Sequence, residues 1–166
     1  MTRWFALALL ALTAACSGAE PSTADPIEPP AAVEIWLPAS SPAFEAQAAW
    51  GLPLTCELTV ELLSLADLQN AFGGPPADGT RWAHADGCTL TLAPELLAPE
   101  QSSIRAMVLA HEFGHVLAYA HGRQGHLAVS DGCPTDAAGR HLMCAGGDEA
   151  LTPSPDAVDY AFVLGE

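Results

Sequence analysis

The sequence predicts a single α+β domain, and three observations lead to this fold class. Residues 55–62 and 88–92 alternate apolar and polar side chains as strands do, the second with two exposed threonines. A helix is expected from about Pro99 or Glu100 to Leu117, ending in a group of histidines. Residues 151–165 combine a capping residue, an early proline and a final glycine, which indicates a C-terminal helix.

The remaining elements follow in chain order. Strand-like residues 32–37 come first, then a short helix over residues 42–50 that Gly51 ends. A second helix is predicted over residues 64–72, capped by Ser64 and stopped by the glycines and prolines that follow. No internal repeat or second linker interrupts residues 33–166, so we expect one core.

The long helix carries a histidine pair that suits a metal ion. His111 and His115 lie about 40° apart around a helix and about 6 Å apart along it, so both rings can reach one cation. Glu112 is rotated by about 100° and is placed to touch water on the metal. His121 can join only if the chain turns first, so we expect the helix to end near Ala118.

Three neutral imidazoles suit zinc and leave a fourth position for water, whose pKa falls to about 7 there. Glu112 could then take a proton from the water and return it to a departing amine. These residues predict hydrolysis of peptide bonds. Two other hypotheses are an exported binding module that keeps its zinc as structure only, and a metal scavenger.

The segment from His111 to His121 resembles the metzincin metalloproteases, whose pattern is H-E-x-x-H-x-x-G-x-x-H followed by a methionine turn. The resemblance implies a zincin-like fold: a small mixed sheet with an antiparallel edge strand, an active-site helix, a methionine turn and a C-terminal helix of the matrixin type. It assigns His111, His115 and His121 to zinc, Glu112 to catalysis and Met143 to the turn.

Two further details follow from the resemblance. Residues 87–92 are similar to the edge strand that pairs with the extended substrate. Ala145 stands where some members carry a tyrosine that moves on and off the metal, so no such switch is expected.

Ala118 stands where the family has a glycine in the left-handed conformation. Alanine there costs on the order of 1 to 2 kcal/mol, so we expect the turn to survive with some strain. In the alternative, the helix continues to Ala120 and is capped at Gly122. His121 would then point away, and a carboxylate such as Glu149 would be the third ligand.

The N-terminus predicts export. Residues 1–15 have a basic start, an apolar run and a small-residue end, as in a signal peptide. Cys16 resembles the acylated cysteine of bacterial lipoproteins, and residues 16–32 would then be a flexible tether to a periplasmic or cell-surface membrane face. The alternative is a plain secretory peptide that leaves Cys16 free.

The other four cysteines suggest two disulfides in an exported chain. Three pairings are possible, of which we prefer Cys56 with Cys88 and Cys133 with Cys144. A cysteine-zinc site is a weaker interpretation, because no CxxC spacing is present.

The formal net charge is −15, which argues against nucleic acid as a partner. Calcium in residues 131–136 is possible but unsupported by any ordered ligand spacing. We expect a monomer that acts on a peptide or protein substrate. His84, His126 and His141 are expected to be ordinary surface residues.

Overall fold

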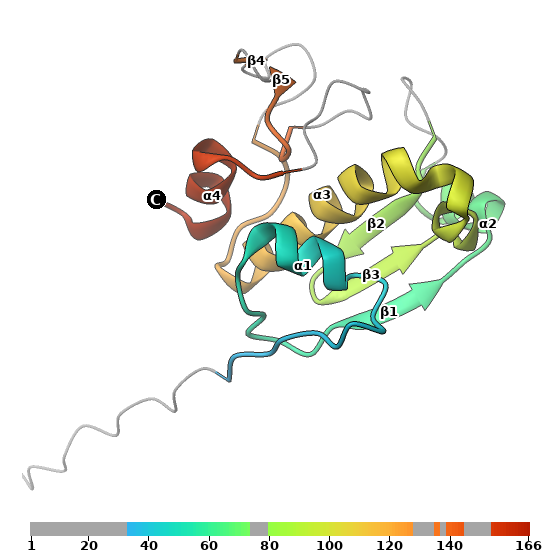
Figure 1. The fold of residues 1–166 in the computed structure, drawn as a ribbon, viewed down its shortest axis with the longest axis horizontal. Helices are drawn as coiled ribbons and strands as arrows, with labels where there is room; N and C mark the ends of the chain where they lie inside the picture. The colour runs from blue at the N-terminus through green and yellow to red at the C-terminus, as the bar shows by residue number, and fades with distance from the viewer. Residues whose placement is uncertain (1–32, 74–79, 128–134, 137–138, 145–153) are drawn as a thin grey trace, which may run out of the picture. The chain divides into compact units, whose positions relative to one another are not determined.

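The fold is described by a computed structural model that covers residues 33–73, 80–127, 135–136, 139–144 and 154–166. All of these residues belong to one compact unit, Ala32–Glu166. The described part contains a mixed three-stranded sheet and four α-helices (Figure 1). The prediction of an α+β domain is therefore confirmed.

The sheet has the strand order β1-β3-β2. Strand β1 (Thr59–Leu62) runs parallel to β3 (Thr89–Leu92), and β2 (Ala83–Asp86) runs antiparallel to β3 on its other side. The sheet is thus mixed, as predicted, and its antiparallel edge strand is β2.

The predicted identity of that edge strand was wrong, because residues 87–92 form the turn into the central strand β3 and then β3 itself. Thr91 is 4 % exposed, and Leu90 and Leu92, which point to the opposite face, are fully buried, so both faces of this central strand are covered. Strand β2 was not predicted at all. Its sequence Ala-His-Ala-Asp lacks the β-branched and aromatic residues that indicate strands.

The first two helices agree with the sequence. Helix α1 (Phe44–Trp50) ends at Gly51, whose φ of 63° lies in the left-handed region. Helix α2 (Leu65–Ala71) begins at Ser64, whose hydroxyl accepts a hydrogen bond from the Asp67 amide. The strand expected at residues 32–37 is reduced to one bridge, between Ile35 and Leu54.

The last two helices frame the candidate site. Helix α3 (Ser102–Ala120) follows a 3-10 turn at Pro99–Gln101, and helix α4 (Ala157–Leu164) begins with a capping box made by Asp156 and Asp159. Two short strands, β4 (Thr135–Asp136) and β5 (Gly139–Arg140), pair antiparallel between them in sequence.

Helix α3 ends later than Ala118, which corrects the predicted boundary. The Gly122 amide donates to the Tyr119 carbonyl at 2.9 Å, and the Arg123 amide donates to the Ala118 carbonyl at 2.8 Å. With Gly122 at φ 71°, this is a Schellman ending. Ala118 stays helical and buried, because alanine favours the helix and the left-handed residue is the glycine.

Two hydrogen bonds connect the helices within the core. The Trp50 indole of α1 donates to the Ala110 carbonyl of α3 at 2.8 Å. The Tyr160 hydroxyl of α4 donates to the Trp50 carbonyl at 2.5 Å. Trp50 is 1 % exposed, and its indole and its carbonyl connect α1 to both α3 and α4 within the core.

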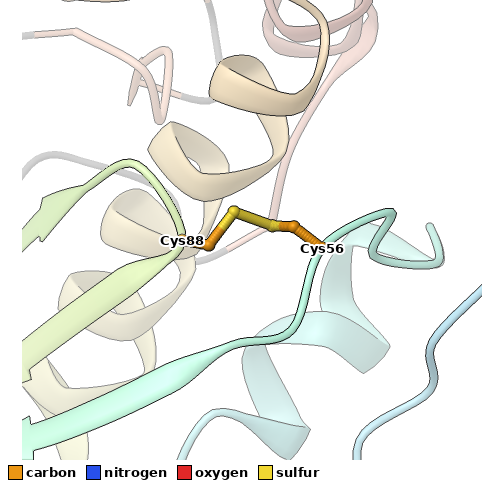
Figure 2. Close-up of a disulfide and its surroundings, with 2 residues drawn as sticks. All are labelled: Cys56 and Cys88. Carbon is orange, nitrogen blue, oxygen red and sulfur yellow. A yellow bond between two sulfur atoms is a disulfide. The ribbon is translucent and has the colours of Figure 1, made fainter.

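The disulfide between Cys56 and Cys88 is present, as predicted, with its Cα atoms 6.3 Å apart. Figure 2 shows that it joins the segment before β1 to the turn between β2 and β3. Cys144 is disulfide-bonded as well, but Cys133 lies outside the described residues, so that pairing stays a prediction. In the described part of the chain, no helix is both long and apolar enough to span a bilayer.

Candidate metal site

Three histidine rings converge beside helix α3. The Nε2 atoms of His111 and His115 are 3.2 Å apart, and each lies 3.3 Å from Nε2 of His126. The first two rings come from successive turns of α3, and the third comes from the segment after it. These three residues form one of the groups in the described chain that could hold a metal ion.

The spacing of the three nitrogens fits zinc. Ligands about 2.05 Å from a tetrahedral ion lie about 3.3 Å from one another. The nitrogen distances of 3.2 and 3.3 Å match that value. Three imidazole nitrogens are also a donor set that zinc commonly takes in catalytic sites, with a fourth position left open.

The outer nitrogens determine which atoms face inward. His111 Nδ1 lies 2.5 Å from the Leu142 carbonyl, and the His115 ring is hydrogen-bonded to the Gly125 backbone. A carbonyl can only accept, so the neutral His111 ring carries its proton on Nδ1 and presents a lone pair at Nε2. This lone pair faces the Nε2 atoms of His115 and His126 and can bind a cation.

The environment also favours neutral rings. Burial, and then the neighbouring His111 and His126 rings, lower the pKa of His115 to about 3. Burial and His111 lower the pKa of His126 to about 4, although that residue as a whole is exposed. Burial likewise lowers the pKa of His111. Neutral imidazole is the form that binds a metal.

His121 does not belong to this group, contrary to the sequence-based assignment. It is the exposed residue at the C-terminal end of α3, where the helix runs past the predicted turn. The helix end matches the alternative considered for Ala120 and Gly122, but the third ring is His126. Glu149, the ligand in that alternative, lies outside the described residues.

His126 was missed because the number of residues between His115 and His126 differs from the spacing in the metzincin pattern. A signal was nevertheless present in the two glycines before it. Gly122 and Gly125 have φ values of 71° and 86°, which other residues rarely adopt. They let the chain leave the helix and fold back over it. The Leu127 amide then donates to the Met143 carbonyl at 2.8 Å and holds this segment against the turn below.

Met143 packs against α3 at Gly114, which lies between His111 and His115 in the sequence. It is fully buried, and a Cβ placed on Gly114 would come within 2.3 Å of its sulfur and 2.6 Å of Trp50 Cζ2. Gly114 therefore permits a close approach that alanine would obstruct. The same turn carries Leu142, whose carbonyl contacts His111. Met143 and the carbonyl that contacts His111 thus belong to adjacent residues.

Glu112 connects helix α3 to the edge strand. Its Oε2 atom accepts a hydrogen bond from the Ala85 amide of β2 at 2.8 Å. Burial raises the pKa of Glu112, and His84, the Ala85 hydrogen bond and Arg81 oppose that effect. The carboxylate therefore stands between the helix that carries the histidines and the edge of the sheet.

The geometry of β2 leaves part of its backbone facing away from β3. The Ala93 amide donates to the Trp82 carbonyl at 2.9 Å, and Ala85 uses its amide for Glu112. In an antiparallel pair the bonded residues alternate, so the backbone groups of Ala83 and Ala85 point away from β3. Among the described residues, β2 pairs with no other strand.

The other two histidines are not free surface groups either. The His84 ring lies 4.0 Å from the Phe72 ring, centroid to centroid, and is half-buried. His141 is 6 % exposed, and its Nδ1 contacts the Asp156 carboxylate. His141, Asp156 and Asp159 form a second group with metal-like spacing, but the Asp159 oxygens already accept backbone amides. We interpret this second group as structural.

No family model, curated protein or solved structure matches this chain. Its function must therefore be inferred from the chemistry of the site. The His111, His115 and His126 rings and the Glu112 carboxylate are the groups that bear on it.

Proposed function

We propose that this chain is a zinc-dependent endopeptidase with a zincin-like fold, similar to the metzincins. The observation that carries the proposal is the convergence of three Nε2 atoms at 3.2 to 3.3 Å, with a carboxylate on the residue next to the first ligand. His111, His115 and His126 would hold the ion. His126 replaces His121 in the ligand set because it is the ring that lies within reach.

Zinc, when bound, would polarise the substrate carbonyl and lower the pKa of a water molecule to about 7. Glu112 accepts the proton of the attacking water on its carboxylate and delivers it to the departing amine. Its hydrogen bond from the Ala85 amide holds the carboxylate in one orientation while the proton moves. His111 and His115 remain neutral, because burial lowers the pKa of both rings and outweighs the backbone hydrogen bonds that raise it.

The edge strand supports a peptide as the substrate. The amide and carbonyl of Ala83 and the carbonyl of Ala85 point away from β3, where an extended peptide can add as a further strand, while the Ala85 amide stays with Glu112. Main-chain hydrogen bonds of this kind bind a peptide largely independently of its side chains. Because Glu112 contacts Ala85, a peptide held along β2 would pass beside the proposed general base.

We further propose that the protein is exported as a lipoprotein. The proposal rests on the signal-like residues 1–15 and on Cys16, all of which lie outside the described residues. A lipid on Cys16 would place the domain at a membrane face. Metabolic labelling with a palmitate analogue tests this, and a Cys16→Ser variant is the control.

Cleavage of a peptide library tests the enzymatic proposal directly. The purified chain should cleave peptides, lose cleavage when a chelator removes the metal, and regain it with added zinc. Glu112→Gln should bind one zinc ion per chain yet lose at least about 100-fold in kcat, because general acid-base catalysis contributes about 10² to 10⁴. Glu100→Gln, an exposed change just before the same helix, should leave kcat unchanged.

Two outcomes would overturn the proposal in different ways. One tightly bound zinc without cleavage of any library member would favour a binding module. Several weakly bound ions per chain would favour a metal scavenger.

A further inference from the structure

The carboxylate of Asp159 in helix α4 is fully buried and clamps the turn that carries Met143. Its Oδ1 atom accepts the Met143 amide at 2.8 Å, and its Oδ2 atom accepts the Leu142 amide at 3.1 Å. Oδ2 also accepts the amide of Asp156 at 3.0 Å. Asp159 is 0 % exposed, and these three donors are all backbone groups.

The clamped turn touches one candidate ligand and the residue that follows another. The Leu142 carbonyl lies 2.5 Å from His111 Nδ1 and determines which nitrogen of that ring faces inward. The Met143 carbonyl accepts the amide of Leu127, the residue directly after His126, at 2.8 Å. One peptide segment therefore orients a ring on α3 and anchors the segment that supplies the third ring.

We propose that Asp159 is a positioning residue for the metal centre, acting through the amides of Leu142 and Met143. This inference rests on the proposed metal site but not on hydrolysis. Neither amide contacts the ligands itself. The Leu142 carbonyl contacts His111 and the Met143 carbonyl contacts the residue after His126, so a rotation of this turn displaces both carbonyls together. The C-terminal helix thereby determines how tightly His111 and His126 bind.

Asparagine is a sharp probe of this role because it keeps the size of aspartate. Its single oxygen can accept the amide on one side only, and its NH₂ group would face an N–H donor on the other side. In either orientation, the amide of Leu142 or that of Met143 is then left without an acceptor. The turn loses one of its anchors, while the rest of helix α4 remains the same.

The test measures the zinc dissociation constant of the purified full chain by chelator competition, together with the d–d absorption spectrum of the Co²⁺ form. Asp159→Asn should weaken zinc binding about 10- to 100-fold, the range typical of groups that orient metal ligands, and should alter the Co²⁺ spectrum. Val163→Ala is the matched control. Val163 is fully buried in the same helix but makes no hydrogen bond to the turn, so its loss should cost stability without changing either readout.

A folded Asp159→Asn protein with the wild-type zinc affinity and the wild-type Co²⁺ spectrum would overturn the inference. Equal weakening in Val163→Ala would also overturn it, because general loosening of α4 would then suffice. Circular dichroism checks folding. If Asp159→Asn is unfolded, Asp159→Glu, which keeps the charge and shifts it by one methylene, undergoes the same comparison. Failure of the wild-type chain to bind one tight zinc ion would instead refute the proposed function.

Discussion

At the scale of single residues, the candidate site depends on which nitrogen of each ring is free. The Leu142 carbonyl engages Nδ1 of His111, so this ring presents the lone pair of Nε2 toward His115. His126 completes the group at 3.3 Å from each. Glu112 remains outside this contact because it is rotated around α3 and bonded to Ala85.

The choice of third ligand is the most direct residue-level prediction. His126→Ala should weaken zinc binding by more than about 100-fold, since it removes a ligand and not merely a supporting group. His121→Ala should leave zinc affinity unchanged, because His121 is exposed at the end of α3 and outside the ligand group. Zinc stoichiometry and chelator competition on both variants provide the measurement. If His121→Ala weakens zinc binding and His126→Ala does not, His121 is the third ligand, as the metzincin spacing predicts.

At the scale of elements, the segment after α3 must reverse direction within a few residues to bring His126 over the helix. Gly125 adopts φ 86° and its backbone contacts His115. Helix α4 holds the turn on the other side of the site through Asp159. The third ring, His126, lies in the segment after α3 and not on a helix, so its position depends on the geometry of this loop.

Gly125→Ala tests that dependence. A Cβ at this φ costs on the order of 1 to 2 kcal/mol, although it meets no other atom within 4 Å. We expect the segment to relieve the strain by shifting, which should weaken zinc binding about tenfold or more. Gly51→Ala is the matched control, since Gly51 has φ 63° and equal free space but lies at the end of α1. Zinc affinities that fall equally in both variants would argue against a specific role for Gly125.

The cap of helix α4 predicts a pH dependence of stability. Burial alone would raise the pKa of Asp156, but hydrogen bonds from the Asp159 amide, the His141 ring and the Val158 amide outweigh it and lower the pKa below 3.8. The folded pKa is thus below the unfolded one. The ionised carboxylate therefore stabilises the fold above about pH 4, and this contribution disappears as the pH falls through the folded pKa.

Asp156→Asn isolates this effect because asparagine caps helices about as well as aspartate. The free energy of unfolding, measured in urea from pH 7 down to pH 2.5, should be lower for the variant near neutrality. The two proteins should then converge as the pH falls below 4. A difference that stays constant over the whole range would mean that the charge of Asp156 is not involved.

At the scale of the whole molecule, the site unites parts of the chain that are far apart in sequence. Trp50 of α1 bonds to α3, Tyr160 of α4 bonds to Trp50, and Ala85 of the sheet bonds to Glu112. A metal bound here would therefore stabilise the contacts among helices and sheet, and not the helix α3 alone.

Zinc removal should accordingly lower the thermal midpoint. At a free zinc concentration of 100 times Kd, binding stabilises the fold by about 2.7 kcal/mol, which corresponds to roughly 5 to 11 °C for a chain of this size. Differential scanning calorimetry with and without chelator measures the shift. The double variant His111→Ala, His115→Ala should show none. A chelator effect that persists in this variant would locate the ion elsewhere.

Local patterns in the sequence suffice to predict several parts of this molecule. The end of α1 and the start of α2 follow from Gly51 and Ser64, because capping chemistry depends on neighbouring residues only. The pair His111 and His115 follows from helical periodicity, and the preference for the Cys56–Cys88 disulfide, one of three possible pairings, follows from the two predicted strands that it joins. These features need no knowledge of distant contacts.

Only the tertiary structure decided the rest. Strand β2 has weak strand propensity and exists because it pairs with β3, which makes β3 the central strand. The selection of His126 over His121 required knowing where α3 ends and where the glycines turn the chain. Spacing along a helix determines two ligands, whereas a third one from a loop depends on contacts such as that between Leu127 and Met143, which residue order does not reveal.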